Sequence, residues 1–220
     1  MGANNLQKVF KDKSLLELAF THKSWVNEHP ADRGSNERLE FLGDAILEFL
    51  VSKRLYQGFP DKEEGFLTAL RASLVNTQNL SEIAQKLEIG KSLFLSKGEE
   101  DGGGRQNPSL LADTIEAIIG ALYIDAGLDA VSDFLEKNLF VQIPQKASQP
   151  LKDAKSQLQE LVQAESASSP RYVVVEESGP DHDKKFIMEV EVDGRKVGRG
   201  GGKSKSEAEQ EAAKAALKSL

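Results

Sequence analysis

The segment LLADTIEAIIGALYID, residues 110–125, carries apolar side chains on nearly every side of a helix. Such a helix lies in the core of a protein, because a helix at the surface keeps one polar face. It falls short of the roughly 18 apolar residues that a membrane-spanning helix needs. The segment therefore predicts a buried helix, and solvent exposure does not account for the two acids within it, Asp113 and Glu116.

Other segments of the first 140 residues have the pattern of amphipathic helices. From Ser14 to about Phe140, apolar residues recur at spacings of three and four, as in NERLEFLGDAILEFLV (residues 36–51). This spacing is typical of helices that bury one face. Glycines such as Gly58 and Gly127 supply helix ends. We expect an all-α domain.

The pattern changes after Phe140. Residues 141–150, VQIPQKASQP, have two prolines and no apolar periodicity, which is typical of a linker. Beyond them we predict a helix over about 151–164, a final helix over about 206–219, and between them the strands RYVVVEES, KFIMEVEV and RKVGRG. Asp193-Gly194 is a two-residue hairpin signal. We predict an all-α domain (1–143), a linker (144–149) and a small α+β domain of order α-β-β-β-α (150–220).

The composition limits the class of protein and its partners. The chain has no cysteine, which excludes disulfides and thiolate metal sites, and its start lacks an apolar signal segment, so we expect a cytoplasmic protein without a membrane partner. The net charge of −7 argues against nucleic acid, because phosphate binding normally needs a basic surplus. Most of the acid excess lies in residues 1–150 (16 Lys+Arg against 22 Asp+Glu), and residues 151–220 are nearly neutral (12 against 13).

An acidic stripe runs along the helix expected over residues 36–51. On a helical wheel the acids fall within an arc of about 80°; they are Glu37, Glu40, Asp44 and Glu48. The opposite, apolar side holds Leu39, Leu42, Ala45, Ile46, Phe49 and Leu50. Taken alone, such a stripe is usually a solvated face.

The two acids in the apolar helix change this interpretation. Asp113 and Glu116 are three residues apart and share a face with apolar side chains. A buried carboxylate costs several kcal/mol unless it is paired with a cation or a metal, and no Lys or Arg of the two segments faces the acids. If the helices pack together, Glu40 and Asp44 meet Asp113 and Glu116. The alternative is a cluster satisfied by basic side chains from elsewhere in the fold.

A set of four carboxylates without thiol or imidazole is an all-oxygen site. Oxygen ligands suit Mg²⁺ or Mn²⁺ and are poor for zinc. A hard divalent ion lowers the pKa of a bound water and steadies charge on phosphate oxygens, which is the chemistry of phosphodiester hydrolysis.

Two motifs resemble bacterial ribonuclease III: ERLEFLGDA from Glu37 to Ala45, and DTIEA from Asp113 to Ala117. The resemblance implies an Mg²⁺-dependent endonuclease, with Mn²⁺ as a substitute, that cuts double-stranded RNA and leaves 5′-phosphate and 3′-hydroxyl ends. By position, Glu40, Asp113 and Glu116 correspond to metal ligands. Asp44 and Glu116 correspond to catalytic residues.

The same resemblance implies a homodimer. Phe41 matches an aromatic residue that, in this family, inserts into a socket on a second subunit. Glu37 and Glu64 match acids that shape the dimer and the cleavage site. The sequence around Glu64, with Glu63 before it and Gly65 after it, favours an ordinary surface acid near a helix start.

The C-terminal segment resembles the double-stranded RNA-binding module. Gln159 and Glu160 on its first helix, and His182 in the turn GPDHDKKF, correspond to groups that face RNA minor grooves. Ser204 and Glu207 form an S-x-x-E capping box, so a helix starts there, and Lys203 and Lys205 beside that start are suited to RNA phosphates.

This segment departs from the family pattern in two ways. Ser206 stands where a second lysine is usual, and the run GRGGG is long. We expect weaker phosphate binding, with Arg199 or the pair Lys184 and Lys185 compensating.

The likeness as a whole predicts an enzyme that processes ribosomal RNA precursors and structured messenger RNAs. One alternative is a binding protein without catalysis, which predicts the loss of at least one of the four acids. The other is a metal-dependent hydrolase of a small phosphate compound, which leaves the second domain unexplained.

Overall fold

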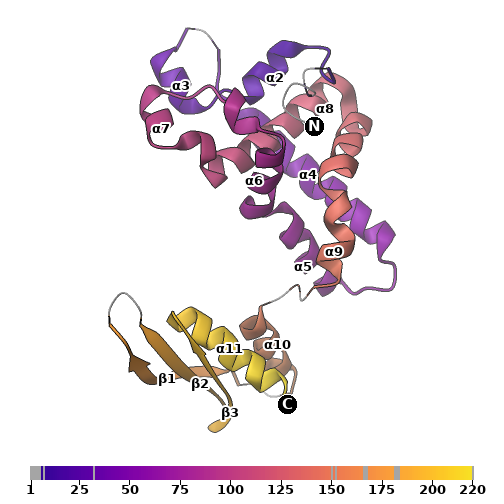
Figure 1. Cartoon of the computed structure of the whole chain (residues 1–220). Coiled ribbons are helices and arrows are strands. Elements are labelled where there is room, and N and C mark those ends of the chain that lie inside the picture. Colours follow the sequence, from indigo (N-terminus) through magenta and orange to yellow (C-terminus); the bar gives the residue numbers. More distant parts are fainter. Residues whose placement is uncertain are drawn as a thin grey trace. The chain divides into compact units, whose positions relative to one another are not determined.

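The computed structural model divides the chain into two compact units, Met1–Leu151 and Lys152–Leu220 (Figure 1). It describes residues 6, 8–31, 33–149, 151, 153–165, 168–180 and 184–219. None of the helices in these ranges is long and apolar enough to cross a membrane.

The first unit consists of helices and turns, with one isolated β-bridge between Thr21 and Phe94. Its α-helices are α2 (Lys13–Ala19), α3 (Lys23–Glu28), α4 (Glu37–Gly58), α5 (Glu64–Val75), α6 (Thr77–Lys86), α7 (Lys97–Asp101), α8 (Pro108–Asn138) and α9 (Ile143–Ala147). Three 3₁₀ turns join them: η1 (Ile89–Ser92), η2 (Gly104–Gln106) and η3 (Phe140–Gln142). The predicted all-α domain is confirmed.

Helix α8 is the centre of this unit and packs against α2, α4 and α6. Between Leu111 and Leu122 every residue is buried except Asp113 and Glu116, which are half-buried. The prediction of a buried helix interrupted by two acids is therefore confirmed. The predicted stop at Gly127 is a kink, because this glycine takes the non-helical angles φ 83° and ψ −176° inside the helix.

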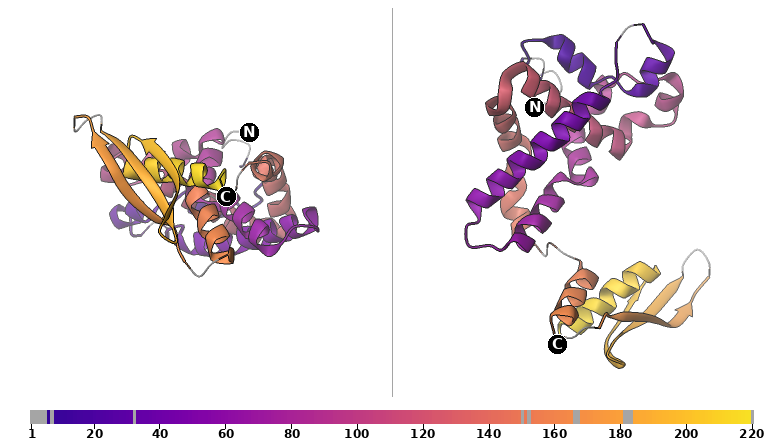
Figure 2. Two further views of the ribbon diagram at one scale, coloured as in Figure 1. Left: turned by 90° about the horizontal axis from the view of Figure 1, so that it is seen from below. Right: turned by 180° about the vertical axis from the view of Figure 1, so that it is seen from behind.

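Glycines let α4 and α8 touch through their backbones. A Cβ atom on Gly43 would lie 1.7 Å from the carbonyl oxygen of Glu116, and one on Gly120 would lie 2.2 Å from that of Leu39. Real side chains cannot approach this closely, so only glycine permits the crossing. In the right-hand view of Figure 2, α4 runs along the length of the unit.

The buried face of α4 differs from the predicted one. Gly43, Leu47 and Val51 are buried, whereas Ala45 is exposed and the Phe49 side chain is 55% exposed, although both were assigned to the apolar side. The glycine contact causes this difference, because it turns α4 so that the side beside Gly43 faces α8. The buried face is thereby shifted toward the acidic stripe.

The segment expected to be a linker is partly helical. Pro144 lies at the start of α9, a position that favours helix initiation. Ile143 is buried and α9 packs against α5. The few apolar residues of the segment show no helical spacing, so the pattern alone did not indicate this helix. The exact limits of the two domains stay a prediction.

The second unit has the predicted order α-β-β-β-α: α10 (Ala154–Glu165), β1 (Arg171–Ser178), β2 (Lys185–Val192), β3 (Arg195–Gly202) and α11 (Lys205–Leu217). The strands form an antiparallel sheet in the order β1-β2-β3. Helices α10 and α11 pack against each other, and α11 covers β2 and β3 (Figure 1). Asp193 and Gly194 both have positive φ, 51° and 74°, which is the type I′ hairpin that their sequence predicts.

The glycine run has a packing role. A Cβ atom on Gly198 or Gly200 would lie within 2.3 Å of the α11 backbone, and one on Gly202 would lie 2.7 Å from it. Alternate residues of a strand point to one face, so these three glycines let β3 lie directly against α11. At Gly201, which points to the other face, the nearest atom would be 3.6 Å away.

Candidate active site

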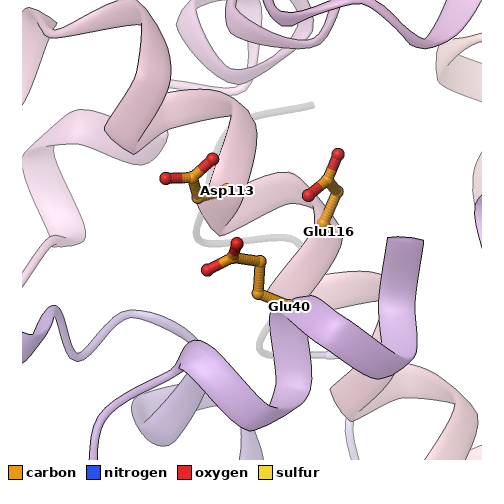
Figure 3. A group of neighbouring side chains, drawn as sticks. All are labelled: Glu40, Asp113 and Glu116. Carbon is orange, nitrogen blue, oxygen red and sulfur yellow. The ribbon is translucent and has the colours of Figure 1, made fainter. Parts of the chain in front are cut away.

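Three carboxylates meet where α4 crosses α8. Glu40 comes from α4, three residues before Gly43, and Asp113 and Glu116 come from α8, before Gly120 (Figure 3). One oxygen of each carboxylate lies within 4.8 Å of the others. The close crossing of the two backbones therefore brings together three of the four acids that the sequence singled out.

These carboxylates have no basic partner in the part of the chain that the structure describes: none of the three forms a salt bridge there. Burial raises the pKa of Glu40, and the charge of Asp113 raises it further. Burial also raises the pKa of Asp113, although the nearby His22 and Lys23 oppose this effect.

Glu116 has the most strongly perturbed acid group of the cluster. Burial, followed by the charges of Asp44, Asp113 and Glu40, raises its pKa to about 8. A carboxyl group with such a pKa binds a proton near neutral pH unless a cation replaces that proton. The arrangement thus holds excess negative charge that a cation would relieve.

Asp44 lies one turn after Glu40 on α4 and is exposed. It is not among the three acids whose oxygens lie within 4.8 Å of one another. Its charge nevertheless contributes to the raised pKa of Glu116. Asp44 is therefore a neighbour of the cluster with access to solvent.

The donor set fits a hard divalent cation. Three carboxylates from two helices, half-buried and unpaired, supply only oxygen ligands, which is the preference of Mg²⁺ and Mn²⁺. Glu40, Asp113 and Glu116 are the residues that could hold such an ion, and Glu40 and Asp113 also line a cavity of about 200 Å³.

Two further acids of the stripe, Glu37 and Glu48, are ion-paired. Glu48 forms a salt bridge of 2.9 Å with Arg71 of α5, and both side chains remain partly exposed to solvent. Glu37 accepts hydrogen bonds from the Ser35 hydroxyl and the Lys23 ammonium, and these bonds lower its pKa. The stripe thus holds the ion-paired Glu37 and Glu48, the exposed Asp44, and Glu40 of the carboxylate cluster.

His22 and Lys23 were missed by sequence reasoning. Both line a cavity of about 200 Å³ together with Glu37, Glu40 and Asp113. Burial lowers the pKa of His22, which favours its neutral form. No pattern in the sequence links residues 22 and 23 to α4, because only tertiary contacts bring them there.

The second unit presents its predicted RNA contacts at the surface. Gln159 and Glu160 are exposed on α10, and Lys203 and Lys205 are exposed at the start of α11. The Ser204 hydroxyl accepts the backbone N–H of Glu207, as the capping box predicts. The Glu207 carboxylate accepts the N–H of Lys203. His182 lies outside the described residues.

The possible compensating cations differ in position. Arg199 alternates with Gly198 and Gly200, so it points to the sheet face away from α11 and pairs across the ladder with Glu189. Its role in compensating for Ser206 stays a prediction. Lys184 forms a 3.0 Å salt bridge with Glu177, and Lys185 is exposed.

Comparisons with known proteins match both units. Residues 12–143 match the family described as ribonuclease-III-like, and residues 154–220 match the double-stranded RNA binding motif. Ribonuclease 3 of Geobacillus kaustophilus is 50% identical over 99% of this chain and 89% of its own length. Ribonuclease 3 of Oceanobacillus iheyensis is 50% identical over 96% and 93%. This chain belongs to the ribonuclease III family.

A solved ribonuclease III structure agrees with this assignment. The nuclease domain of ribonuclease III from Campylobacter jejuni is 40% identical with a TM-score of 0.58, over 64% of this chain and 95% of that chain. That structure is described as showing flexibility in the region involved in dimer formation. A ribonuclease III with a double-stranded RNA-binding domain is an endoribonuclease that acts on double-stranded RNA, and the family depends on a metal.

Phe41 and Glu64, which the resemblance also singled out, are not among the three acids of the carboxylate cluster. Phe41 is 81% exposed on α4. Glu64 begins α5 and accepts a 2.9 Å hydrogen bond from the Thr68 hydroxyl. It lines a cavity of about 360 Å³ with Phe49 and Tyr56.

Proposed function

We propose that this ribonuclease III hydrolyses phosphodiester bonds in double-stranded RNA with Mg²⁺ bound by Glu40, Asp113 and Glu116, and leaves 5′-phosphate and 3′-hydroxyl ends. The observation that carries the proposal is the set of three half-buried carboxylates, without salt bridges among the described residues, whose oxygens lie within 4.8 Å of one another. Mn²⁺, with the same preference for oxygen ligands, would substitute.

The bound ion would supply a lowered pKa for water and compensation of charge on phosphate oxygens. Asp44 and Glu116 act as the catalytic residues in this proposal. Asp44 is exposed beside the cluster, so it can orient the attacking water and accept its proton. Glu116 would be both a ligand and a catalytic residue: a bound cation would replace the proton that its half-buried carboxyl group otherwise holds near neutral pH.

The second domain would hold the RNA by its shape and backbone. Lys203 and Lys205 bind phosphates across the major groove, while Gln159, Glu160 and His182 face the adjoining minor grooves. Their exposure, and the capped start of α11 between the lysines, support this role for the four that the structure describes. We propose domain limits of 1–143 and 150–220, with 144–149 between them.

We further propose a homodimer in which Phe41 contacts the second subunit, and Glu37 and Glu64 shape the interface and cleavage site. Phe41, Phe49 and Tyr56 are 81%, 55% and 76% exposed, and their spacing places them on one side of α4. A run of exposed aromatic side chains marks an interaction surface. Cleavage would occur in the cytoplasm, on ribosomal RNA precursors and structured messenger RNAs.

Cleavage of a double-stranded RNA tests the proposal. The wild-type chain with Mg²⁺ should cut, Glu116→Gln should cut at least about 10³-fold more slowly, and Glu136→Gln should match the wild type. Glu136 is the control because it lies on the same helix but pairs with Arg54 at the surface. Uncut RNA with the wild type would favour a binding protein; equal cutting by Glu116→Gln would refute the site. Analysis of the product ends tests the chemistry.

Sedimentation tests the dimer. Phe41→Ala should shift the wild-type dimer toward monomer, whereas Val141→Ala, which removes another exposed apolar side chain (65% exposed), should not. A wild-type monomer at micromolar concentration would refute the dimer without affecting the assignment of the acids.

A further inference from the structure

The cavity beside the carboxylate cluster is lined by one lysine side chain, that of Lys23. Of the residues that line it, Lys23 is the one Lys or Arg among those described. The acids that line it are Glu37, Glu40 and Asp113, so acidic side chains outnumber the single Lys. An RNA phosphate that enters the cavity would be repelled by these acids and attracted by Lys23.

Short backbone bonds attach the segment of Lys23 to the start of α4. The Asn36 N–H donates to the Thr21 carbonyl at 2.8 Å, and the His22 N–H donates to the Phe94 carbonyl at 3.1 Å. The buried Asn36 side chain donates to the Ala19 carbonyl at 3.1 Å. Lys23 therefore has a defined position relative to Glu37 and Glu40.

The partner of Lys23 in this structure is exchangeable. Its ammonium lies 3.3 Å from a Glu37 oxygen, and the two side chains are 63% and 53% exposed. Ion pairs this exposed contribute little to stability. An RNA phosphate can therefore replace Glu37 as the partner of Lys23, or share Lys23 with it, at a small cost in free energy.

We propose that Lys23 is a substrate-binding residue of the active site, whose ammonium contacts a non-bridging oxygen of an RNA phosphate at the cavity next to Glu40 and Asp113. The inference rests on the proposed function, since it assigns a further contact for the same substrate. Lys23 would hold the RNA strand in register with the three carboxylates. Its positive charge would reduce the repulsion between these carboxylates and the RNA phosphate.

The proposal predicts effects of opposite sign on metal and RNA. A cation repels a second cation and attracts phosphate. Removal of the Lys23 charge should therefore leave Mn²⁺ binding unchanged or tighter, while RNA cleavage slows. General damage to the site would weaken both, so the two measurements separate a substrate contact from a structural role.

The experiment compares Lys23→Met, Lys23→Gln and Lys23→Arg in the full chain. Lys91→Met is the matched control, because Lys91 also pairs with an exposed glutamate, Glu88, but does not line the cavity. Single-turnover cleavage at saturating Mg²⁺ should slow about tenfold or more in Lys23→Met and Lys23→Gln, less than the 10²–10³-fold of a buried donor. Lys23→Arg should recover most of the rate. Calorimetry with Mn²⁺ alone should show no loss of affinity.

RNA binding provides a second measurement that does not need cleavage. In a Glu116→Gln background, Lys23→Met should reduce the slope of log affinity against log salt by about one. If the wild type cuts RNA and Lys23→Met cuts it at the same rate, the role of Lys23 is refuted but the proposed function is not. Weaker Mn²⁺ binding alongside slower cleavage would also refute the role of Lys23. A wild-type chain that does not cut would refute the proposed function itself.

Discussion

Both domains use glycine to bring two elements into backbone contact, but the two contacts position functional groups differently. In the nuclease domain, Gly43 and Gly120 let α4 touch α8. The acids one turn away then face one another across the crossing. In the RNA-binding domain, Gly198, Gly200 and Gly202 let β3 touch α11. There the lysines that we propose to bind phosphate, Lys203 and Lys205, lie at the start of α11.

The difference has an energetic consequence. The first contact encloses like charges, as the raised pKa values of Glu40, Asp113 and Glu116 show. The second contact is made by the α11 backbone, by alanines such as Ala212 and Ala216, and by side-chain carbons of Glu207 and Glu211. The contact between α4 and α8 thus brings negative charges together that a bound metal ion would neutralise. The contact between β3 and α11 fixes the position of α11.

Gly43→Ala should have the largest effect on stability. The added methyl group would lie 1.7 Å from the Glu116 carbonyl oxygen, and both helices are held by the core, so neither can move away easily. We expect a loss of about 3 kcal/mol or more, followed through the fluorescence of the single tryptophan, Trp25, in this domain. Cleavage should also fall sharply because the acids separate.

Gly58→Ala is the control on the same helix. No atom lies within 4 Å of its added Cβ, so stability should change by no more than about 1 kcal/mol. Equal effects of the two substitutions would show that helix propensity, and not the crossing, determines the result.

The pH dependence of stability should distinguish the two contacts next. The pKa of Glu116 is about 8 when folded, against 4.5 ordinarily, so the folded state binds its proton more tightly. Its stabilising contribution is complete below about pH 4.5 and is lost as the pH rises to about 8. Without metal, we expect the nuclease domain to lose on the order of 2–3 kcal/mol over this window, allowing for solvent screening.

Chemical unfolding in a chelating buffer, at pH 5.5 and pH 8.5, measures this loss. Glu116→Gln should be less sensitive to pH than the wild type, and Mg²⁺ should restore wild-type stability at pH 8.5. If stability depends on pH equally in the wild type and in Glu116→Gln, protonation of Glu116 is not the cause of the loss.

Gly200→Ala should disrupt the contact in the RNA-binding domain at a smaller cost. Its Cβ would lie 2.1 Å from the Ala212 nitrogen, but β3 is an edge strand and can shift. We expect a loss of about 2 kcal/mol and weaker RNA binding, with the Trp25 transition unchanged. Gly201→Ala, where the nearest atom is 3.6 Å away, should bind RNA normally. If Gly200→Ala and Gly201→Ala lost equal RNA affinity, the side of β3 on which the glycine lies would not determine the effect.

Local patterns predicted the long helices of the first domain and all the elements of the second, but not the short helices α3, α7 and α9. Apolar spacing gave the helices, and alternation with Asp193-Gly194 gave the β2–β3 hairpin. The meeting of Glu40 with Asp113 and Glu116 was predictable because a buried acid requires a partner. These inferences need no knowledge of how one helix is rotated against another.

Features that depend on that rotation were not predictable. A wheel of α4 alone places Phe49 in the core, because it does not include the contact of Gly43 with α8. The pairing of Glu48 with Arg71 and the arrival of Lys23 beside Glu37 also arise from tertiary packing. Sequence reasoning thus identified the acids that make the candidate site and missed the cation beside them.

Lys203→Ala should have the smallest effect and tests what the second contact is for. Lys203 is exposed beside the capped start of α11, so its removal should leave folding intact and remove one phosphate contact. We expect RNA affinity to fall by about 1 kcal/mol and the salt slope to fall by about one. Lys214→Ala, near the far end of the same helix and paired with Glu211, should leave both unchanged. If the slope of log affinity against log salt were the same in Lys203→Ala and Lys214→Ala, the start of α11 would not bind phosphate. The contact of β3 with α11 would then serve only the stability of the fold.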